Sequence, residues 1–390
     1  MNTLDFSLRQ ITDRIRAATA DCTPLRIRGG ATKDFYGESL QGELLDVRPL
    51  SGITSYEPSE LVVTVGAGTP LLALETALAE KGQCLAFEPP RFGPEATVGG
   101  MVAAGLSGPS RASVGAVRDF VLGVKLLNGK GDLLTFGGQV MKNVAGYDVS
   151  RLMVGALGTL GVLTEISLKV LPVAPAEATL VFELDQAAAL ARLHQWGGQP
   201  LPLNASCWVR DDTAAGQPEQ LWVRLRGAVA AVESACRKMT QAVPGTRLNN
   251  AQAFPYWENS RDLRSPFFVP QTSQTRQTAQ PTSKEHDPLV LWRLSLPQTA
   301  PVLDLPYAQL IEWHGGQRWL WAPLSVQTQL RQAVAKVGAT VTLFMAHDIG
   351  TAAQARFSPL TPALTLIHQR LKAEFDPAGI FNRGRLYPAF

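Results

Sequence analysis

The sequence has few cysteines and no paired metal ligands. Its four cysteines, Cys22, Cys84, Cys207 and Cys236, lie far apart, with no C-x-x-C pair and no histidine at ligand spacing. Structural zinc sites, iron–sulfur clusters and disulfide frameworks need closely spaced ligands or a regular set of cysteines. We therefore predict four reduced cysteines of structural type and no metal site.

Long apolar runs are also missing. No uninterrupted stretch approaches the ~18 residues that a membrane-spanning helix needs. The first ten residues, MNTLDFSLRQ, contain Asp5 and lack the apolar region of a signal peptide. We therefore expect no transmembrane segment and a cytoplasmic location, with peripheral attachment at the inner membrane through a partner as an alternative.

Neither sign of charge dominates. The sequence has 36 Lys and Arg against 33 Asp and Glu, which gives a net charge of +3, and no basic run alternates with aromatic residues. A nucleic acid partner is therefore not expected, whereas an acidic small molecule fits this balance. With 390 residues, of which 45% are hydrophobic, the chain is long enough for two or three domains.

Glycine, in contrast, is abundant and clustered. Fifteen of the 34 glycines lie between Gly93 and Gly161. Glycine permits positive φ angles and close approach of the backbone to a ligand, so this density is typical of main-chain N–H groups that surround a large anion. The pattern predicts a phosphate-bearing cofactor.

Three strings of small residues are candidates for cofactor binding: RGGATK (28–33), ATVGGMVAAGLSG (96–108) and GALGTLGVLTE (155–165). Each string alone is a common turn, but their order and spacing are more specific. A further G-x-G, from Gly66 to Gly68, follows a predicted strand. The third glycine of a Rossmann fingerprint would fall at Leu71, so a nicotinamide-binding Rossmann domain is not expected.

Hydrophobic periodicity predicts the main elements of the first part of the chain. Leu8, Ile11, Ile15 and Ala18 recur at helical spacing. Strands are predicted at 25–28, 43–47, 61–65 and 162–170, a helix from Pro70 to Ala79 after an N-cap at Thr69, and a hairpin around 128–131. Later helices are predicted at 229–243 and 364–375.

Proline and composition predict the domain boundaries. Pro172 and Pro175 precede an alanine-rich stretch and end the first domain. We predict a first domain over 1–172, a smaller α+β domain over 173–340 and a C-terminal segment over 341–390 that packs back on the first domain. The segment 270–288 lacks large aliphatic residues and is expected to be a mobile surface loop.

The glycine strings resemble the motifs of one family of flavoproteins. They match a glycine-rich pyrophosphate loop (29–33), T-V-G-G (97–100), K-x-x-x-G-Y-D (142–148) and G-T-L-G-V-L-T-E (158–165) in family order. This order is similar to that of FAD-binding domains of the vanillyl-alcohol-oxidase or p-cresol-methylhydroxylase (PCMH) type. Over nearly the whole chain, strings such as EPPRFGPEATVGGMVAAGLSGP and DLPYAQLIEWHGGQRWL resemble the FAD-binding E subunits of bacterial glycolate oxidases.

The resemblance implies a fold, an activity and partners. The fold is α+β, with a two-subdomain PCMH-type FAD-binding domain over 1–172 and a smaller, truncated ferredoxin-like cap domain over 173–340. The implied partners are a larger FAD-linked subunit and an iron–sulfur subunit. The implied complex oxidises glycolate, a small 2-hydroxy acid, to glyoxylate and passes electrons toward quinone.

The resemblance also implies cofactor-binding residues. These are Gly29, Gly30, Ala31, Thr32, Lys33, Thr97, Gly99, Gly100, Gly105, Gly161, Val162, Asn382 and Arg385. Arg383 stands where the family's terminal motif has proline. All five histidines lie outside the first 193 residues, so we expect FAD to be bound without a covalent histidine link.

The sequence does not identify a catalytic base. Oxidation of a 2-hydroxy acid by a flavin needs a base or a metal for the hydroxyl proton. Lys142, Tyr147 and Arg151 are candidates for polar groups near the flavin edge, and a salt-bridged subdomain junction is the alternative. His347 lies in MAHDIG, which lacks the paired histidines of related catalytic subunits. We interpret it as a structural or surface residue, with a remnant of a substrate site as the alternative.

Three functions therefore stay open. The first is a flavoprotein subunit that is active only in a complex with its partners. The second is a self-sufficient FAD-dependent 2-hydroxyacid dehydrogenase, and the third is a non-redox assembly subunit that has lost the cofactor. The intact pyrophosphate and T-V-G-G strings count against the third.

Overall fold

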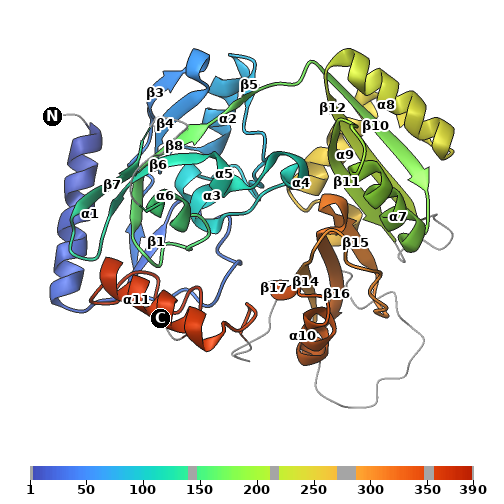
Figure 1. The fold of residues 1–390 in the computed structure, drawn as a ribbon. Helices are drawn as coiled ribbons and strands as arrows, with labels where there is room; N and C mark the ends of the chain where they lie inside the picture. Colours follow the sequence, from blue (N-terminus) through green and yellow to red (C-terminus); the bar gives the residue numbers. More distant parts are fainter. Residues whose placement is uncertain (1–2, 139–146, 211–218, 270–286, 347–354, 389–390) are drawn as a thin grey trace. The chain divides into compact units, whose positions relative to one another are not determined.

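The computed structural model describes residues 3–138, 147–210, 219–269, 287–346 and 355–388, and these residues form two compact units (Figure 1). Unit 1 comprises Met1–Ser107, Gly115–Val173 and Pro359–Phe390, and unit 2 comprises Gly108–Val114 and Ala174–Ser358. Within the described ranges, no helix is long and apolar enough to cross a membrane.

A five-stranded antiparallel sheet forms the centre of unit 1. Its strands are β3 (Ile53–Glu57), β4 (Val62–Gly66), β8 (Val162–Lys169), β6 (Val121–Leu127) and β7 (Leu133–Gly137), in this spatial order. The predicted hairpin joins β6 to β7, and Asn128 closes its turn because its Oδ1 accepts from the backbone N of Lys130 and of Asp132, at 2.9 Å each. A nicotinamide-binding Rossmann domain would need a parallel sheet here.

Two small sheets complete the strands of unit 1. β1 (Leu25–Arg28) pairs in parallel with β2 (Glu43–Asp46), and β5 (Gln83–Cys84) pairs with β9 (Leu171–Pro172). The first helix, α1 (Thr3–Ala20), has the predicted periodicity, and its residues Ile11 and Ile15 are buried in one apolar cluster with Leu25, Ile380 and Phe381.

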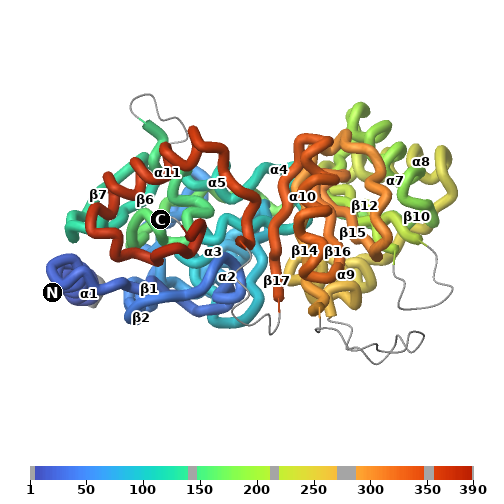
Figure 2. Tube along the Cα trace, turned by 90° about the horizontal axis from the view of Figure 1, so that it is seen from below, coloured from blue at the N-terminus to red at the C-terminus, as the bar shows by residue number. Residues whose placement is uncertain are grey.

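Short helices connect the strands of unit 1: α2 (Leu71–Ala79), α3 (Val98–Ala104), α5 (Val117–Phe120) and α6 (Val149–Leu152). A longer helix, α11 (Pro362–Phe375), follows near the C-terminus. Figure 2 shows α11 beside β6 and β7, and the rings of Phe375 and Phe136 meet edge-on with centroids 6.2 Å apart. The last helix of the chain therefore packs on the first domain.

One antiparallel sheet of eight strands runs through unit 2. Its spatial order is β13-β10-β12-β11-β15-β16-β14-β17. The elements are β10 (Ala176–Glu183), α7 (Gln186–Gly197), β11 (Leu203–Val209), β12 (Gln220–Gly227), α8 (Val229–Ala242), β13 (Thr246–Leu248), α9 (Asn250–Arg261), β14 (Leu289–Ser295), β15 (Gln309–Glu312), β16 (Gln317–Pro323), α10 (Gln327–Ala335) and β17 (Thr340–Met345). The short helix α4 (Arg111–Val114) also belongs to this unit.

The sheet of unit 2 consists of two four-stranded halves, and the strand order of the second half is the mirror image of that of the first. The first half, β10-α7-β11-β12-α8-β13, has the β-α-β-β-α-β succession of a ferredoxin-like motif with all its elements present. The second half, β14-β15-β16-α10-β17, has the mirrored strand order but a non-helical connection over 296–308 in place of its first helix. The two halves therefore differ in this one helix, which the second half lacks between β14 and β15.

The structure corrects two predictions about local structure and leaves a third largely untested. The predicted C-terminal segment 341–390 divides, because β17 pairs with β14 in the sheet of unit 2 whereas Pro359–Phe390 lies in unit 1. The predicted N-cap at Thr69 is wrong by one residue: α2 has its N-cap at Pro70, and the Thr69 hydroxyl donates to the carbonyl of Gly66 at 2.7 Å. The predicted loop 270–288 lies mostly outside the described residues.

Candidate functional site

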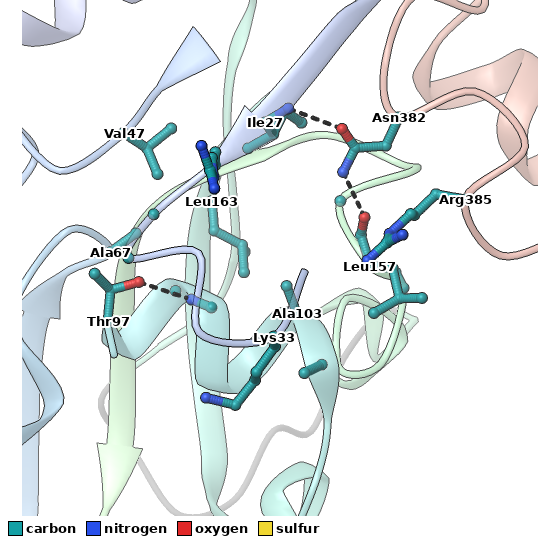
Figure 3. Close-up of a pocket in the computed structure, with 18 of the residues that line it drawn as sticks. Ile27, Lys33, Val47, Ala67, Thr97, Ala103, Leu157, Leu163, Asn382 and Arg385 are labelled. Atoms are coloured by element: carbon teal, nitrogen blue, oxygen red, sulfur yellow. Dashed lines mark hydrogen bonds between the residues drawn. The ribbon is translucent and has the colours of Figure 1, made fainter. Parts of the chain in front are cut away.

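A pocket in unit 1 brings together residues from several separate segments (Figure 3). The space inside it that protein atoms leave free is about 910 Å³, part of it open to solvent. Its walls come from the end of β1 and the loop after it (27–34), from α3 and the turn before it, from the segment 153–163, from Asn382 and Arg385, and from Leu40, Val47 and Ala67.

The loop after β1 has no room for side chains at its two glycines. A Cβ added to Gly30 would lie 1.4 Å from the carbonyl oxygen of Glu95, and one added to Gly29 would lie 2.3 Å from Oγ1 of Thr97. The next residue, Ala31, has φ = 62°, a left-handed conformation that side chains rarely adopt. The loop therefore lies directly against the start of α3, with its backbone facing the pocket.

The start of α3 is fixed by its cap and by β4. Thr97 is the N-cap, and its Oγ1 accepts from the backbone N of Gly100 at 3.2 Å. The backbone N of Gly99 donates to the carbonyl of Ala67 at 2.7 Å, and a Cβ on Gly99 would lie 2.8 Å from the Cβ of Ala67. Glycine at this position lets the helix approach the residue that follows β4.

The segment before β8 forms the opposite wall in a strained conformation. Gly155, Leu157 and Gly158 have φ angles of 82°, 50° and 72°. The backbone N of Gly155 donates to the carbonyl of Val102 at 3.0 Å, and that of Leu157 donates to the carbonyl of Ala103 at 2.9 Å. The loop therefore satisfies carbonyls at the end of α3 that have no partner inside the helix.

Cationic side chains outnumber anionic ones in the pocket wall. Arg28, Lys33 and Arg385 are opposed by one carboxylate, Asp34, among the described lining residues. Arg28 Nη2 lies 2.7 Å from Asp34 Oδ2, and its Nε is buried without a hydrogen-bond partner. This excess of positive charge suits a ligand that carries phosphate groups.

The residues present fit FAD. Glycines whose Cβ positions are blocked by neighbouring backbone let main-chain N–H groups approach a pyrophosphate, and Arg28 and Lys33 supply positive charge beside them. The apolar part of the wall, with Val47, Leu160 and Leu163, offers surfaces against which flat rings pack. These residues would hold the cofactor mainly through backbone and shape.

Most of the predicted cofactor residues do converge on this pocket. The lining includes Gly29, Gly30, Ala31, Thr32, Lys33, Thr97, Gly99, Gly100, Gly161, Asn382 and Arg385. Gly105 and Val162 do not line it: Gly105 is the left-handed C-cap of α3, with φ = 64°, and Val162 is fully buried in the apolar cluster around α1.

Neither of the two catalytic candidates that the structure describes lines the pocket. Tyr147 is 95% exposed, and Arg151 forms an exposed ion pair with Asp148, with Nε and Oδ2 3.0 Å apart. Neither lines the pocket in the part of the chain that the structure describes, and Lys142 and His347 lie outside that part. Arg151 pairs with the N-cap residue of its own helix α6, so this pair does not join two subdomains, and a role of Arg151 near the flavin stays a prediction.

Several residues that line the pocket belong to the glycine motifs but were not predicted as site residues. Arg28 stands within the quoted string RGGATK and Gly158 within GALGTLGVLTE, but neither was singled out. Ala67 is the middle residue of Gly66-Ala67-Gly68, which lacks the third glycine of a Rossmann fingerprint, and it lines this pocket. Asp34, Leu40 and Val47 carry no motif, because only the folding of their segments brings them to the wall.

Comparison with known proteins identifies the family. Residues 7–137 match the family described as FAD binding domain. The chain is 43% identical over 384 residues to the glycolate oxidase subunit GlcE of Escherichia coli (strain K12), across 98% of both chains. It is 32% identical over 177 residues to the glycolate oxidase subunit GlcD of Bacillus subtilis (strain 168), across 44% of this chain and 37% of that protein.

Solved structures confirm the fold class. The structure of 4-ethylphenol oxidase from Gulosibacter chungangensis aligns with a TM-score of 0.68 over 97% of this chain and 87% of that one, at 14% identity. A likeness at this identity shows the fold alone. The 43% identity to GlcE over nearly the full length of both chains, together with this fold, confirms the resemblance that the motifs indicate. The chain therefore belongs to the family of FAD-binding oxidoreductase subunits that includes GlcE.

Proposed function

We propose that this chain is the FAD-binding subunit of a glycolate oxidase complex that oxidises glycolate to glyoxylate. The observation that carries the proposal is the pocket of unit 1, where the glycine strings of the family converge in a chain 43% identical to GlcE over its whole length. When bound, FAD supplies a two-electron acceptor for such a reaction. An iron–sulfur subunit and quinone are the proposed onward acceptors.

The cofactor is proposed to be bound without a covalent bond. Covalent flavin attachment requires a nucleophilic side chain at the ring, and the described lining residues include no histidine, cysteine or tyrosine. The pocket instead offers backbone N–H groups, small side chains and cations. These groups bind a dinucleotide reversibly, so denaturation should release free FAD.

The described wall offers few groups that can accept a proton from a substrate hydroxyl. Its one carboxylate, Asp34, is paired with Arg28 at 2.7 Å, and its one lysine, Lys33, donates to Thr32 Oγ1 and to the carbonyl of Arg91, at 3.4 Å each. We propose that the base stands on the larger FAD-linked subunit. A cytoplasmic location with membrane attachment only through the partners stays a prediction.

The self-sufficient dehydrogenase is the second candidate, and one similarity favours it. The chain is 31% identical over 166 residues to a mitochondrial D-lactate dehydrogenase [cytochrome] of Arabidopsis thaliana. That match covers 42% of this chain and 29% of the dehydrogenase, so most of that enzyme has no counterpart in the match. Turnover of a 2-hydroxy acid by the isolated chain would favour this candidate.

One experiment separates the candidates. A visible absorption spectrum of the purified chain before and after heat denaturation shows whether FAD is bound and whether it is released. Dye-linked oxidation of glycolate and of D-lactate is then measured with and without the candidate partner subunits. Released FAD with activity only in the mixture supports the complex; activity of the chain alone supports the dehydrogenase. A chain that cannot be loaded with FAD contradicts both.

A further inference from the structure

The last residues of the chain meet the walls of the pocket through buried polar side chains. Residues 372–385 lie more than 200 positions from the glycine loops in sequence, and beyond the matched FAD binding domain at 7–137. We propose that this C-terminal segment holds the two strained pocket loops in the conformation that accepts the cofactor, with Lys372, Asp376 and Asn382 as positioning residues. The inference rests on the proposed function only for the identity of the ligand.

A buried ion pair folds the C-terminal segment on itself. The side chains of Lys372 and Asp376 are 8% and 0% exposed, and Lys372 Nζ lies 2.7 Å from Asp376 Oδ2. Asp376 also accepts from the backbone N of Ile380 at 3.0 Å and of Phe381 at 2.8 Å. Its carboxylate is thus bound to one ammonium and two amides, which fixes the turn after α11.

The same ammonium reaches one pocket loop. Lys372 Nζ donates to the carbonyl of Thr159 at 2.8 Å and to that of Phe381 at 2.7 Å. Burial lowers the pKa of Lys372 from its usual value, and the neighbouring Asp376 opposes that change. Because all three donors of the ammonium have partners, Lys372 ties the C-terminal turn to the segment that precedes β8.

Asn382 joins both pocket loops through its side-chain amide. Its Oδ1 accepts from the backbone N of Ile27 at 2.8 Å, just before the glycine loop, and its Nδ2 donates to the carbonyl of Leu157 at 2.6 Å. Figure 3 shows the side chain between these two segments. Both polar atoms of Asn382 are therefore used within the protein, although the residue lines the pocket.

Arg385 makes the same kind of contact with the far side of the glycine loop. Its Nη2 donates to the carbonyl of Asp34 at 2.8 Å and also to that of Tyr36, and its Nη1 donates to the carbonyl of Glu38. A guanidinium that contacts three carbonyls of one turn orders the backbone of that turn. Arg385 was predicted to bind the cofactor, and its bonds point to positioning the loop.

The loop that these residues contact needs such support. Leu157 has φ = 50°, and left-handed residues other than glycine persist only where their surroundings hold them. A Cβ on the next residue, Gly158, would lie 2.7 Å from Asn382 Nδ2, so the loop and the Asn382 amide are closely fitted. Removal of the amide leaves the Leu157 carbonyl without this donor and lets the wall relax.

The test uses graded substitutions at Asn382 in the full chain. Asn382 itself has φ = 39°, which glycine and aspartate tolerate. Asn382→Gly removes both bonds, whereas Asn382→Asp keeps the acceptor for Ile27 and loses the donor to Leu157. Asn249→Gly is a matched control, because Asn249 caps α9 in unit 2 through the backbone N of Gln252.

Hydrogen exchange of the cofactor-free chain is the first readout. Asn382→Gly is expected to speed exchange at both loops, 27–33 and 155–161, and Asn382→Asp mainly at 155–161, while Asn249→Gly changes neither. A residue that only touches the cofactor would leave exchange in the cofactor-free chain unchanged, and that result overturns the proposal. This readout holds even if the chain proves unable to bind FAD.

FAD affinity is the second readout, measured by quenching of flavin fluorescence. Asn382→Gly is expected to raise the Kd about 10- to 100-fold, with a smaller rise for Asn382→Asp and none for Asn249→Gly. Tryptophan emission, which reports on unit 2 alone, should stay the same in all Asn382 variants. An unchanged Kd in Asn382→Gly contradicts a role in positioning the site.

Discussion

Unit 1 forms its pocket largely from backbone and small residues, whereas unit 2 buries large and polar side chains against one another. All eight tryptophans lie in unit 2, between Trp196 and Trp321. Glycines with positive φ lie in unit 1, apart from Gly315 and Gly338 among the described residues. Unit 1 thus leaves space for a ligand, whereas unit 2 fills its interior with its own side chains.

Glu312 shows how unit 2 satisfies its buried polar groups. The side chain is 3% exposed and accepts from Ser260 Oγ at 2.8 Å, Gln317 Nε2 at 3.0 Å and Trp319 Nε1 at 2.8 Å. Burial raises the pKa of Glu312, and the three donors oppose that shift. Arg28 at the pocket wall of unit 1 has a buried Nε without a partner, and in unit 2 the Nε and Nη1 of Arg318 are also buried without one. Unpartnered buried atoms therefore occur in both units, and the one of Arg28 lies where a ligand can supply an acceptor.

The largest expected effect is on the backbone of unit 1. Gly30→Val should raise the Kd for FAD about 100-fold or more, because the Cβ of the new valine would lie 1.4 Å from the carbonyl oxygen of Glu95. Flavin fluorescence titration measures the loss. Gly138→Ala is the control within the same unit, because a Cβ there has nothing within 4 Å. Equal FAD affinities in the two variants would contradict the claim that the close backbone approach at Gly30 shapes the pocket of unit 1.

The second effect is on the interior of unit 2. Glu312→Gln should lower the free energy of unfolding of unit 2 by about 2 kcal/mol, because the amide can no longer accept from all three donors. Urea unfolding followed by tryptophan emission measures this loss, and FAD affinity should stay the same. Glu233→Gln breaks an exposed pair with Arg247 and should have almost no effect. A large loss in that control would contradict the role of burial.

A third, smaller effect depends on pH. Burial lowers the pKa of His314 to about 4, with its Nδ1 3.0 Å from Ser206 Oγ and its Nε2 3.1 Å from Ser113 Oγ. The unfolded chain takes up a proton near pH 6.5 and the folded chain only near pH 4, so this contribution to stability is lost as the pH falls through that window. Partial exposure of the ring limits the loss to about 1–2 kcal/mol.

His314→Asn removes that pH dependence while keeping a residue that tolerates φ = 56°. The measurement is the difference in unfolding free energy between the two proteins at several values from pH 7 to pH 4, by tryptophan emission. The wild type should lose stability relative to the variant as the pH falls. Parallel curves would show that His314 titrates normally.

The smallest effect concerns the cap of α3 in unit 1. Thr97→Ala removes the acceptor for the backbone N of Gly100 and should cost about 1 kcal/mol of local stability, with a Kd for FAD raised several-fold. Thr97→Ser keeps the hydroxyl and should bind FAD almost as the wild type does. If both variants lose affinity equally, the methyl group and not the cap supports the pocket.

Local sequence patterns predicted most elements and the glycine part of the site. The periodicity of Leu8, Ile11 and Ile15 gave α1, and the Asn128-Gly129 turn gave the β6–β7 hairpin, because both depend on contacts close in sequence. The same patterns failed where distant segments meet. Thr69 reads as an N-cap, but its hydroxyl bonds to Gly66 in the preceding turn instead.

The site shows the same division. Gly30 and Gly99 could be singled out because only glycine fits where backbones touch, and such constraints appear as motifs. Asp34 and Val47 have no motif, and Val162 belongs to a motif but faces the apolar core. Whether a motif residue faces the pocket or the core is decided by the register of the strand, which a motif does not encode.

By itself, the sequence determined the cofactor class, the family and the order of the cofactor loops, because glycine and cap residues act through local backbone geometry. Only the tertiary structure decided that Lys372 and Asn382 bind the loops at 27 and 157–159, and that residues 341–345 complete the sheet of unit 2. Such contacts join positions far apart in the chain. Their hydrogen bonds exist only after folding has buried them, so no local pattern marks them.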